Sequence, residues 1–311
     1  MSRDPSLGVV RSARREAQRR RTRRRRFASA GLIVALAAGV AFALAPPPHA
    51  SPLHRVGLHS RPAPLPRLWE EAAVRLRLPQ SLPQRTLAIP ILMYHRIGRI
   101  TASLPLLTRA LTVAPAAFAA QMQLLHRHRF HAVTQQELFT ALEHRASLPL
   151  RPVMITFDDG YRDVLWNAAP VLARLHMPAT AYVTGRISGR DSSFLTWQEL
   201  RTLEAHGIQI GSHTVHHLDL TRLSNSAALR ELEDSRQILE RHLHHPVQWL
   251  AYPIGAEDAR IRALVREAGY VLAVTEHPGV EQAANHPFEL HRYEIRDTTT
   301  SPVLEAFLAG A

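Results

Sequence analysis

Short apolar runs alternate with amphipathic helical stretches from about residue 86 to the end of this 311-residue chain. The apolar runs predict strands at 89–95, 152–157, 180–184, 208–212, 249–253, 270–275 and 290–295. The amphipathic stretches predict helices at 114–128, 164–176, 196–206, 226–243, 258–268 and 302–309. Strands and helices that alternate in this way form an α/β fold with a parallel sheet, which is either open or closed as a barrel.

The residues that carry chemistry lie at the ends of predicted strands. These residues are His95, Asp158, Asp159, His213 and Pro253. In open and closed parallel sheets alike, functional groups gather at the carboxyl ends of the strands. We therefore expect these residues to meet in one site.

Two histidines stand out in the stretch GSHTVHH at 211–217. His213 and His217 lie four residues apart just past a strand, so both imidazoles can reach one zinc or other divalent ion. The pair alone is a weak indication in a chain with 19 histidines. Because the chain has no cysteine, a zinc site built from thiolates is excluded.

Two carboxylates end the apolar run of VMITFDDG at 153–160. At a strand tip two adjacent carboxylates repel one another and lose solvation, so a nearby cation is expected. The chain turns at this point, so Asp158 and Asp159 can approach the same centre from different angles. A helix N-cap would account for one of the two aspartates but hardly for both.

One aspartate, His213 and His217 together form a mixed nitrogen and oxygen set with an open coordination position. A metal in an open site of this kind binds a water molecule and lowers its pKa. The second aspartate is then free to accept the remaining proton. This combination predicts a metal-dependent hydrolase.

Three motifs follow one another along the chain: TFDDG at 156–160, SHTVHH at 212–217 and YPIG at 252–255. Their order and spacing resemble the polysaccharide deacetylase family, the metal-dependent carbohydrate esterases of the chitooligosaccharide deacetylase type. The resemblance covers roughly residues 88–300 and implies a distorted (β/α) barrel of about seven parallel strands. It makes residues 86–311 the catalytic domain.

The same resemblance gives roles to the charged residues. It implies that Asp158 is the general base and that Asp159, His213 and His217 bind the metal. The implied cofactor is a divalent metal ion, expected to be Zn²⁺, with Ni²⁺, Co²⁺ and Fe²⁺ as alternatives.

The third motif departs from the family pattern. The family usually has Arg-x-Pro-Tyr there, whereas this chain has Ala-Tyr-Pro-Ile at 251–254. The arginine that would hold the catalytic aspartate is therefore absent, and Arg292 is a candidate replacement. Tyr252 is a candidate supporting residue. The backbone N–H of Ile254 can still stabilise an oxyanion, because that role needs no side chain.

The general acid has two candidates. The stretch ILMYHRIG at 91–98 resembles the family branch that deacetylates poly-β-1,6-N-acetylglucosamine, in which a histidine near the start of the domain is the acid. That histidine corresponds to His95. His291 competes with it, because other members place the acid histidine after a leucine near the C-terminus. Trp197, in the first turn of a predicted helix, is a candidate for contact with the sugar.

These assignments predict an enzyme that removes N-acetyl groups from a polysaccharide of N-acetylglucosamine, with poly-β-1,6-N-acetylglucosamine as the expected substrate. A deacetylase of peptidoglycan, of chitin or of O-acetyl esters is an alternative that the motifs barely separate from it. A non-catalytic polysaccharide-binding protein of the same fold is a further alternative. The intact metal ligands and the free Asp158 argue against the last, because a binding module needs no base.

The formal net charge of +12 is concentrated at the N-terminus, where residues 1–27 carry eleven arginines and two acidic residues. The uncharged stretch at 27–45 approaches the length of a membrane-spanning helix. Arg23 to Arg26 precede it, so the positive-inside rule places a basic arm of residues 1–26 in the cytoplasm. Such arms usually meet acidic lipid, so we expect no nucleic-acid partner.

Residues 46–85 contain PPP and several isolated prolines, as is typical of a linker. The catalytic domain is then expected in the periplasm or outside the cell, tethered to the inner or cell membrane by a single-pass anchor. Cleavage of residues 27–45 as a secretory signal is the alternative. Ala43-Leu44-Ala45 resembles a cleavage site, but Pro46 follows it and disfavours cleavage. The sequence predicts no oligomeric state.

Overall fold

The structure is a computed structural model that describes residues 75–78, 84–186 and 192–309. The predicted arm (1–26) and membrane segment (27–45) lie outside these residues, and the predicted linker is described only in part. Among the described residues, no helix has both the length and the hydrophobicity that a membrane crossing requires.

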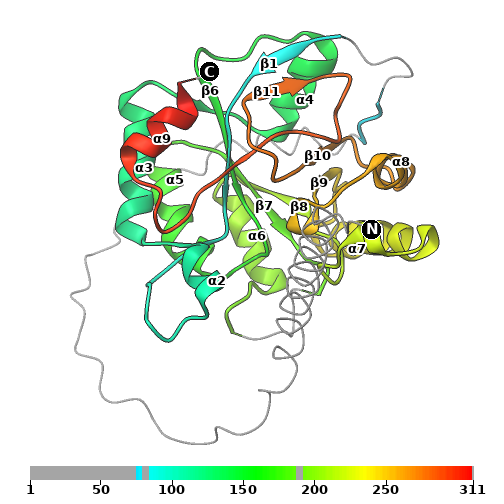
Figure 1. The fold of residues 1–311 in the computed structure, drawn as a ribbon, viewed down its shortest axis with the longest axis horizontal. Coiled ribbons are helices and arrows are strands. Elements are labelled where there is room, and N and C mark those ends of the chain that lie inside the picture. The colour runs from blue at the N-terminus through cyan, green and yellow to red at the C-terminus, as the bar shows by residue number, and fades with distance from the viewer. Residues whose placement is uncertain (1–74, 79–83, 187–191, 310–311) are drawn as a thin grey trace, which may run out of the picture. The chain divides into compact units, whose positions relative to one another are not determined.

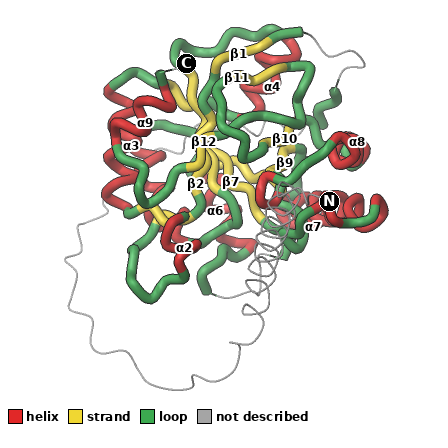
Figure 2. The backbone as a smooth tube through the Cα atoms, viewed as in Figure 1, coloured by secondary structure: helices red, strands yellow, loops and turns green. Residues whose placement is uncertain are grey.

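Seven parallel strands form the central sheet. In spatial order they are β10 (Leu272–Val274), β9 (Trp249–Ala251), β8 (Ile208–Ser212), β7 (Ala179–Val183), β6 (Pro152–Phe157), β2 (Ile91–Tyr94) and β12 (Tyr293–Glu294). A short strand, β5 (His131–Ala132), also pairs with β6 in parallel. Each of the seven overlaps a predicted strand, so the predicted parallel sheet is confirmed. Figure 2 shows the strands at the centre, with the helices outside them.

One segment, residues 290–295, joins the two edges of this sheet. Near its start, the N–H of Leu290 donates to the carbonyl of Ala273 in β10 (3.1 Å). At its end, the N–H of Ile295 donates to the carbonyl of Met93 in β2 (2.8 Å). The sheet therefore curves round on itself between β10 and β2, in agreement with the predicted distorted (β/α) barrel.

The helices pack around the outside of the strands (Figure 1). They are α3 (Pro115–Arg127), α4 (Gln135–His144), α5 (Ala169–Arg174), α6 (Trp197–Ala205), α7 (Asn225–Leu243), α8 (Ala259–Glu267) and α9 (Ser301–Leu308). The predicted helix at 164–176 begins instead as a π-helical turn, Val164–Ala168, before α5. Pro170 lies at this junction and has no N–H for a helical hydrogen bond, which accounts for the irregular start.

Small elements mark the two ends of the barrel. Strand β1 (Thr86–Ala88) pairs antiparallel with β11 (Glu281–Ala283) at the amino ends of the parallel strands. At the other end, β3 (Arg96–Ile97), α2 (Leu106–Ala110) and β4 (Thr112–Val113) follow β2. Figure 1 shows α2 and the β1–β11 pair at opposite ends. The end with α2 is the carboxyl end of the strands, where the predicted site residues lie.

Candidate active site

The three predicted metal ligands lie together at the carboxyl ends of β6 and β8. Asp159, His213 and His217 each offer one ligand atom, and these atoms all lie within 4.8 Å of one another. Oδ1 of Asp159 is 3.6 Å from Nε2 of His213 and 3.4 Å from Nε2 of His217. Two imidazole nitrogens and one carboxylate oxygen that converge in this way fit a divalent metal ion such as zinc.

His213 is oriented by a backbone contact. Its Nδ1 donates a hydrogen bond to the carbonyl of Ala251 (2.8 Å), which leaves the lone pair of Nε2 directed toward Asp159. Burial lowers the pKa of His213 to about 4, although the nearby carboxylate of Asp158 acts in the opposite direction. The imidazole is therefore neutral at pH 7, which is the form that binds a metal.

The turn between the two histidines is held by Glu231 of α7. One carboxylate oxygen of Glu231 accepts hydrogen bonds from the N–H groups of Val215 (3.1 Å) and His216 (2.9 Å). The other oxygen lies 2.5 Å from Nδ1 of His216, so the imidazole of His216 pairs with Glu231. Glu231 is buried, and sequence reasoning missed it. Its only signal was a position on the amphipathic helix that follows the histidine motif.

The site contains an unusual number of residues in the left-handed region. Positive φ angles occur at Asp159 (72°), Thr214 (60°), His217 (59°) and Ile254 (51°). This conformation costs roughly 1–2 kcal/mol for a residue other than glycine. Strained residues persist only where the surroundings fix them, and they cluster at functional sites.

The proposed base, Asp158, forms a two-bond ion pair with Arg292. Nη1 and Nη2 of Arg292 donate to the two carboxylate oxygens at 2.8 and 2.7 Å, and both side chains are fully buried. Arg292 also donates to the carbonyl of Thr275 (2.8 Å) and to the hydroxyl of Thr156 (3.2 Å). Burial raises the pKa of Asp158, but the Arg292 guanidinium outweighs burial and holds the pKa at about 2. Asp158 is therefore ionised at neutral pH.

His95 lies beside Asp158 on the neighbouring strand. Tyr94 and Phe157 are partners in the β2–β6 register, so the next residues, His95 and Asp158, are level with one another. The side chain of His95 is buried, and its Nδ1 has no hydrogen-bond partner among the described residues. Its position suits a group that meets substrate next to the base.

His291 lies next to Arg292 in the segment that closes the barrel. Side chains of an extended segment alternate between its two faces, so His291 points away from the face that Arg292 presents to Asp158. Its ring lies 6.5 Å from the ring of His277. The geometry thus brings His95 rather than His291 to the proposed base.

The third motif forms a tight turn, Pro253–Gly255, after β9. The side chain of Ile254 is more than half exposed at this turn. Gly255 has a φ of 63°, and a Cβ atom added there would lie 2.7 Å from Cβ of Glu276, so glycine is required. The ring of Tyr252 packs in the apolar core beneath α8, and its buried hydroxyl has no hydrogen-bond partner among the described residues. Its ring therefore supports the turn from behind.

Trp197 lies away from this group of residues. Its indole stacks on the imidazole of His242, with ring centroids 3.9 Å apart and an interplanar angle of 10°. His242 is eleven residues beyond Glu231 on α7, which is about 16 Å along a helix axis. This contact places Trp197 in the outer helical layer, so the structure gives no support to the predicted contact with sugar.

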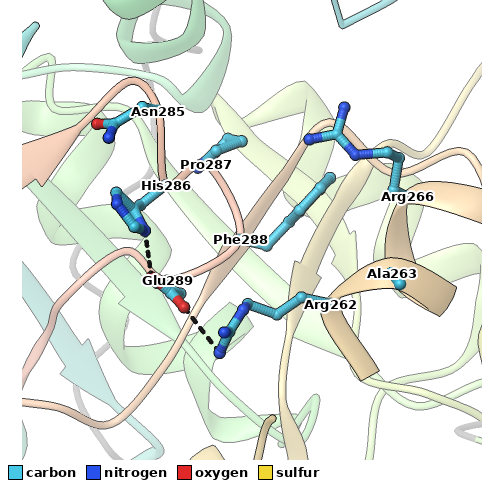
Figure 3. Close-up of a pocket in the computed structure, with 8 residues that line it drawn as sticks. All are labelled: Arg262, Ala263, Arg266, Asn285, His286, Pro287, Phe288 and Glu289. Carbon is cyan, nitrogen blue, oxygen red and sulfur yellow. Dashed lines mark hydrogen bonds and ion pairs between the residues drawn. The ribbon is translucent and has the colours of Figure 1, made fainter. Parts of the chain in front are cut away.

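A pocket of about 170 Å³ lies beside α8 and is lined by Arg262, Ala263, Arg266 and residues 285–289 (Figure 3). Within it, Glu289 contacts Arg262 (2.7 Å) and His286 (2.6 Å), and the guanidinium of Arg266 lies over the ring of Phe288 (5.2 Å). None of the predicted site residues lines this pocket.

Comparison with known proteins agrees with the geometry. Residues 146–273 match the polysaccharide deacetylase family. YxkH of Bacillus subtilis, a protein assigned to the polysaccharide deacetylases, is 30% identical over 220 residues, which are 71% of this chain and 76% of YxkH. The poly-β-1,6-N-acetyl-D-glucosamine N-deacetylase of Staphylococcus aureus is 24% identical over 171 residues, which are 51% of this chain and 59% of that enzyme.

Solved structures of deacetylases share the fold. The deacetylase PplD of Streptococcus pyogenes, solved in complex with acetate, has a TM-score of 0.65 and 26% identity and covers 73% of this chain and 99% of its own. IcaB from Ammonifex degensii has a TM-score of 0.63 and covers 71% of this chain and 97% of its own. At 22% identity, this similarity concerns the fold alone. From the site geometry and from the identity and coverage of the Bacillus subtilis relative, we conclude that this chain belongs to the polysaccharide deacetylase family.

Proposed function

We propose that the protein is a metal-dependent hydrolase that removes N-acetyl groups from poly-β-1,6-N-acetylglucosamine. The observation that carries the proposal is a three-residue ligand set beside a separate, ionised carboxylate. Asp159, His213 and His217 form the ligand set, and Asp158 is the separate carboxylate. The Staphylococcus aureus relative, which is named for N-deacetylation of this polymer, supports the substrate.

A divalent ion, expected to be Zn²⁺, would be held by Asp159, His213 and His217, and when bound it would lower the pKa of water and polarise the acetamide carbonyl. Asp158 accepts the proton of the water whose oxygen attacks the carbonyl carbon. Arg292 keeps Asp158 ionised and fixes the direction of its oxygens.

The other residues act on the oxyanion and on the leaving group. The backbone N–H of Ile254 donates to the carbonyl oxygen as negative charge develops there. His95 donates a proton to the amide nitrogen as the carbon–nitrogen bond breaks. Acetate leaves, and a glucosamine unit with a free amine remains in the polymer.

The test is acetate release by the purified full-length protein. The substrates are β-1,6-linked and β-1,4-linked oligomers of N-acetylglucosamine, each with and without a chelator. We expect release from the β-1,6 oligomer that stops with chelator. The variant Asp158→Asn should lose at least about a hundredfold in rate, because the general base is removed. Asp234→Asn, at an exposed position of α7, is the matched control.

Two results would contradict the proposal. Release from the β-1,4 oligomer alone would assign the enzyme to chitin-like or peptidoglycan-like glycans. Metal binding with no acetate release from either oligomer would indicate another acylated substrate or a binding protein of the same fold.

For the location of the enzyme, we propose a single-pass anchor at residues 27–45 that leaves the catalytic domain outside the cytoplasm. The uncharged stretch and the arginines before it support this proposal. Fractionation of cells that express the full chain should place it with the membrane, and deletion of residues 1–45 should release it. A chain that lacks the N-terminal residues and is found only in the soluble fraction outside the cytoplasm would favour a cleaved signal instead.

A further inference from the structure

The hydroxyl of Thr184 is buried at the carboxyl end of β7 and has no hydrogen-bond partner among the described residues. The side chain is only 1% exposed. The backbone on either side of it is bonded to the metal-ligand turn. The N–H of His213 donates to the carbonyl of Val183 (2.8 Å), and the N–H of Gly185 donates to the carbonyl of Thr214 (2.8 Å). These backbone hydrogen bonds hold Thr184 next to the turn that carries His213 and His217.

The strand register shows where this side chain lies. Val183 and Ser212 are partners in the β7–β8 register, so Thr184 is level with His213. Side chains along a strand alternate, so Thr184 shares the inner face of the barrel with Tyr182. The guanidinium of Arg292 lies 5.6 Å from the ring of Tyr182. Thr184 is two residues, or about 6–7 Å, nearer to the open end of the barrel than Tyr182.

A buried hydroxyl without a partner gains nothing for the fold. Burial removes its hydrogen bonds to water and returns none, which costs stability. Valine has nearly the same shape and would avoid this cost. The hydroxyl is therefore useful to the protein only if a ligand supplies the missing hydrogen bond.

The burial of Thr184 limits which part of a substrate can reach it. Only a small group can reach a side chain that is 1% exposed, and the two-carbon acyl group is much smaller than the sugar ring of the substrate. We propose that the hydroxyl of Thr184 hydrogen-bonds an oxygen of the acetyl group, both in the substrate and in the acetate product. Thr184 is then a substrate-contacting residue, and this role rests on the proposed function.

The test is Thr184→Val in the metal-loaded, full-length protein. Three quantities are measured: the free energy of unfolding, kcat/KM for the acetylated oligomer, and the affinity for acetate by calorimetry. We expect stability to stay the same or rise. We expect kcat/KM and acetate affinity each to fall about tenfold, because one hydrogen bond to the ligand is lost. Thr184→Ser keeps a hydroxyl and should restore most of both.

Thr112→Val is the matched control, because the buried hydroxyl of Thr112 does have a partner and donates to the carbonyl of Thr108 (2.6 Å). It should lose stability and keep both acetate affinity and kcat/KM. The inference is overturned if Thr184→Val binds acetate as tightly as the wild type, whatever its activity, or if the wild type binds no acetate. A wild type that binds acetate but deacetylates no substrate would contradict the proposed function alone.

Discussion

Arg292 and Asp158 form a two-bond ion pair inside the barrel, although 134 residues separate them in the sequence. Asp158 follows β6, and Arg292 lies in the segment that joins β10 to β2. A guanidinium and a carboxylate without water around them are stable only together. Closure of the barrel and ionisation of the proposed base therefore depend on the same contact.

Loss of Arg292 should destabilise the protein strongly. We expect Arg292→Met to lower the free energy of unfolding by about 3–5 kcal/mol, because it leaves the Asp158 carboxylate buried without a partner. The double variant Arg292→Met, Asp158→Asn should regain much of this loss, because asparagine carries no charge. Urea denaturation at pH 7 measures the free energy of unfolding of the wild type, the single variant and the double variant.

The control for this prediction is Arg296→Met, which makes the same change at an exposed arginine. Its ion pair with Glu294 lies at the surface, so its effect should stay within about 0.5 kcal/mol. If Arg292→Met were as stable as Arg296→Met, the contact between Arg292 and Asp158 would not be the one that keeps Asp158 ionised.

The choice between the two acid candidates is open to a direct test. His95→Asn should lower kcat for the amide substrate by about 10²–10⁴-fold, whereas His291→Asn should change it little. An aryl acetate needs no proton on its leaving group, so His95→Asn should act on it almost as fast as the wild type. Equal losses on both substrates would mean that His95 only supports the site, and a large loss in His291→Asn would reverse the assignment.

Glu231 should govern metal affinity without touching the metal. Glu231→Gln replaces the carboxylate that accepts hydrogen bonds from Val215 and His216, so the turn with the ligands loosens. We expect metal affinity to fall about 10–100-fold, with kcat restored at saturating metal. Competition with a chelating dye measures the affinity. Asp234→Asn on the same helix should match the wild type. A kcat that stays low at saturating metal would instead place Glu231 in the chemistry.

Metal removal should lower thermal stability as well as activity. An ion that binds only the folded chain, and not the unfolded one, adds about 2.7 kcal/mol to the free energy of unfolding when its free concentration is a hundred times its Kd. We expect a chelator to lower Tm by several degrees and Zn²⁺ in excess to restore it. His217→Ala should show no such response, because one of the three ligands is missing. A wild-type Tm that does not change when chelator is added would argue against a metal at this site.

Much of this molecule follows from local patterns in the sequence. The predicted strands at 152–157 and 208–212 coincide with β6 and β8, because hydrophobic runs bounded by polar turns specify buried parallel strands. The predicted helix at 196–206 forms as α6, and the capping box of Thr196 and Glu199 at its start is a local sequence signal of a helix N-terminus. The site residues were found for the same reason, because parallel strands present their carboxyl ends at one face.

What the local patterns left undetermined depends on contacts between distant segments. The family resemblance suggests Arg292 as the residue that holds Asp158, and the structure confirms this contact, but no local pattern near residue 292 specifies it, because the contact depends on how the barrel closes. Trp197 was expected near the sugar because of its place in a helix, yet the packing of α6 against α7 turned its ring onto His242. Glu231 and Thr184 carry no motif, and only burial and hydrogen bonding single them out.

The pair of His245 and Glu204, which joins the end of α7 to α6, should make stability depend on pH. Nε2 of His245 lies 2.6 Å from Oε1 of Glu204, and Nδ1 lies 3.0 Å from the carbonyl of Pro246. Both ring nitrogens thus face acceptors, and only the protonated imidazole satisfies both. Burial lowers the pKa of His245, but the hydrogen bond and the charge of Glu204 outweigh burial and raise it above its ordinary value.

Because the folded pKa of His245 exceeds the unfolded value of about 6.5, its contribution to stability is complete below that value. The contribution is lost as the pH rises through the folded pKa. Glu204→Gln removes the charge that raises this pKa, so the variant should lack the pH-dependent contribution of His245 to stability. We expect the difference in Tm between wild type and variant to be larger at about pH 5.5 than at about pH 9. Thermal unfolding at both pH values measures it, and a difference that stays constant or grows with pH would show that His245 is not protonated by this contact.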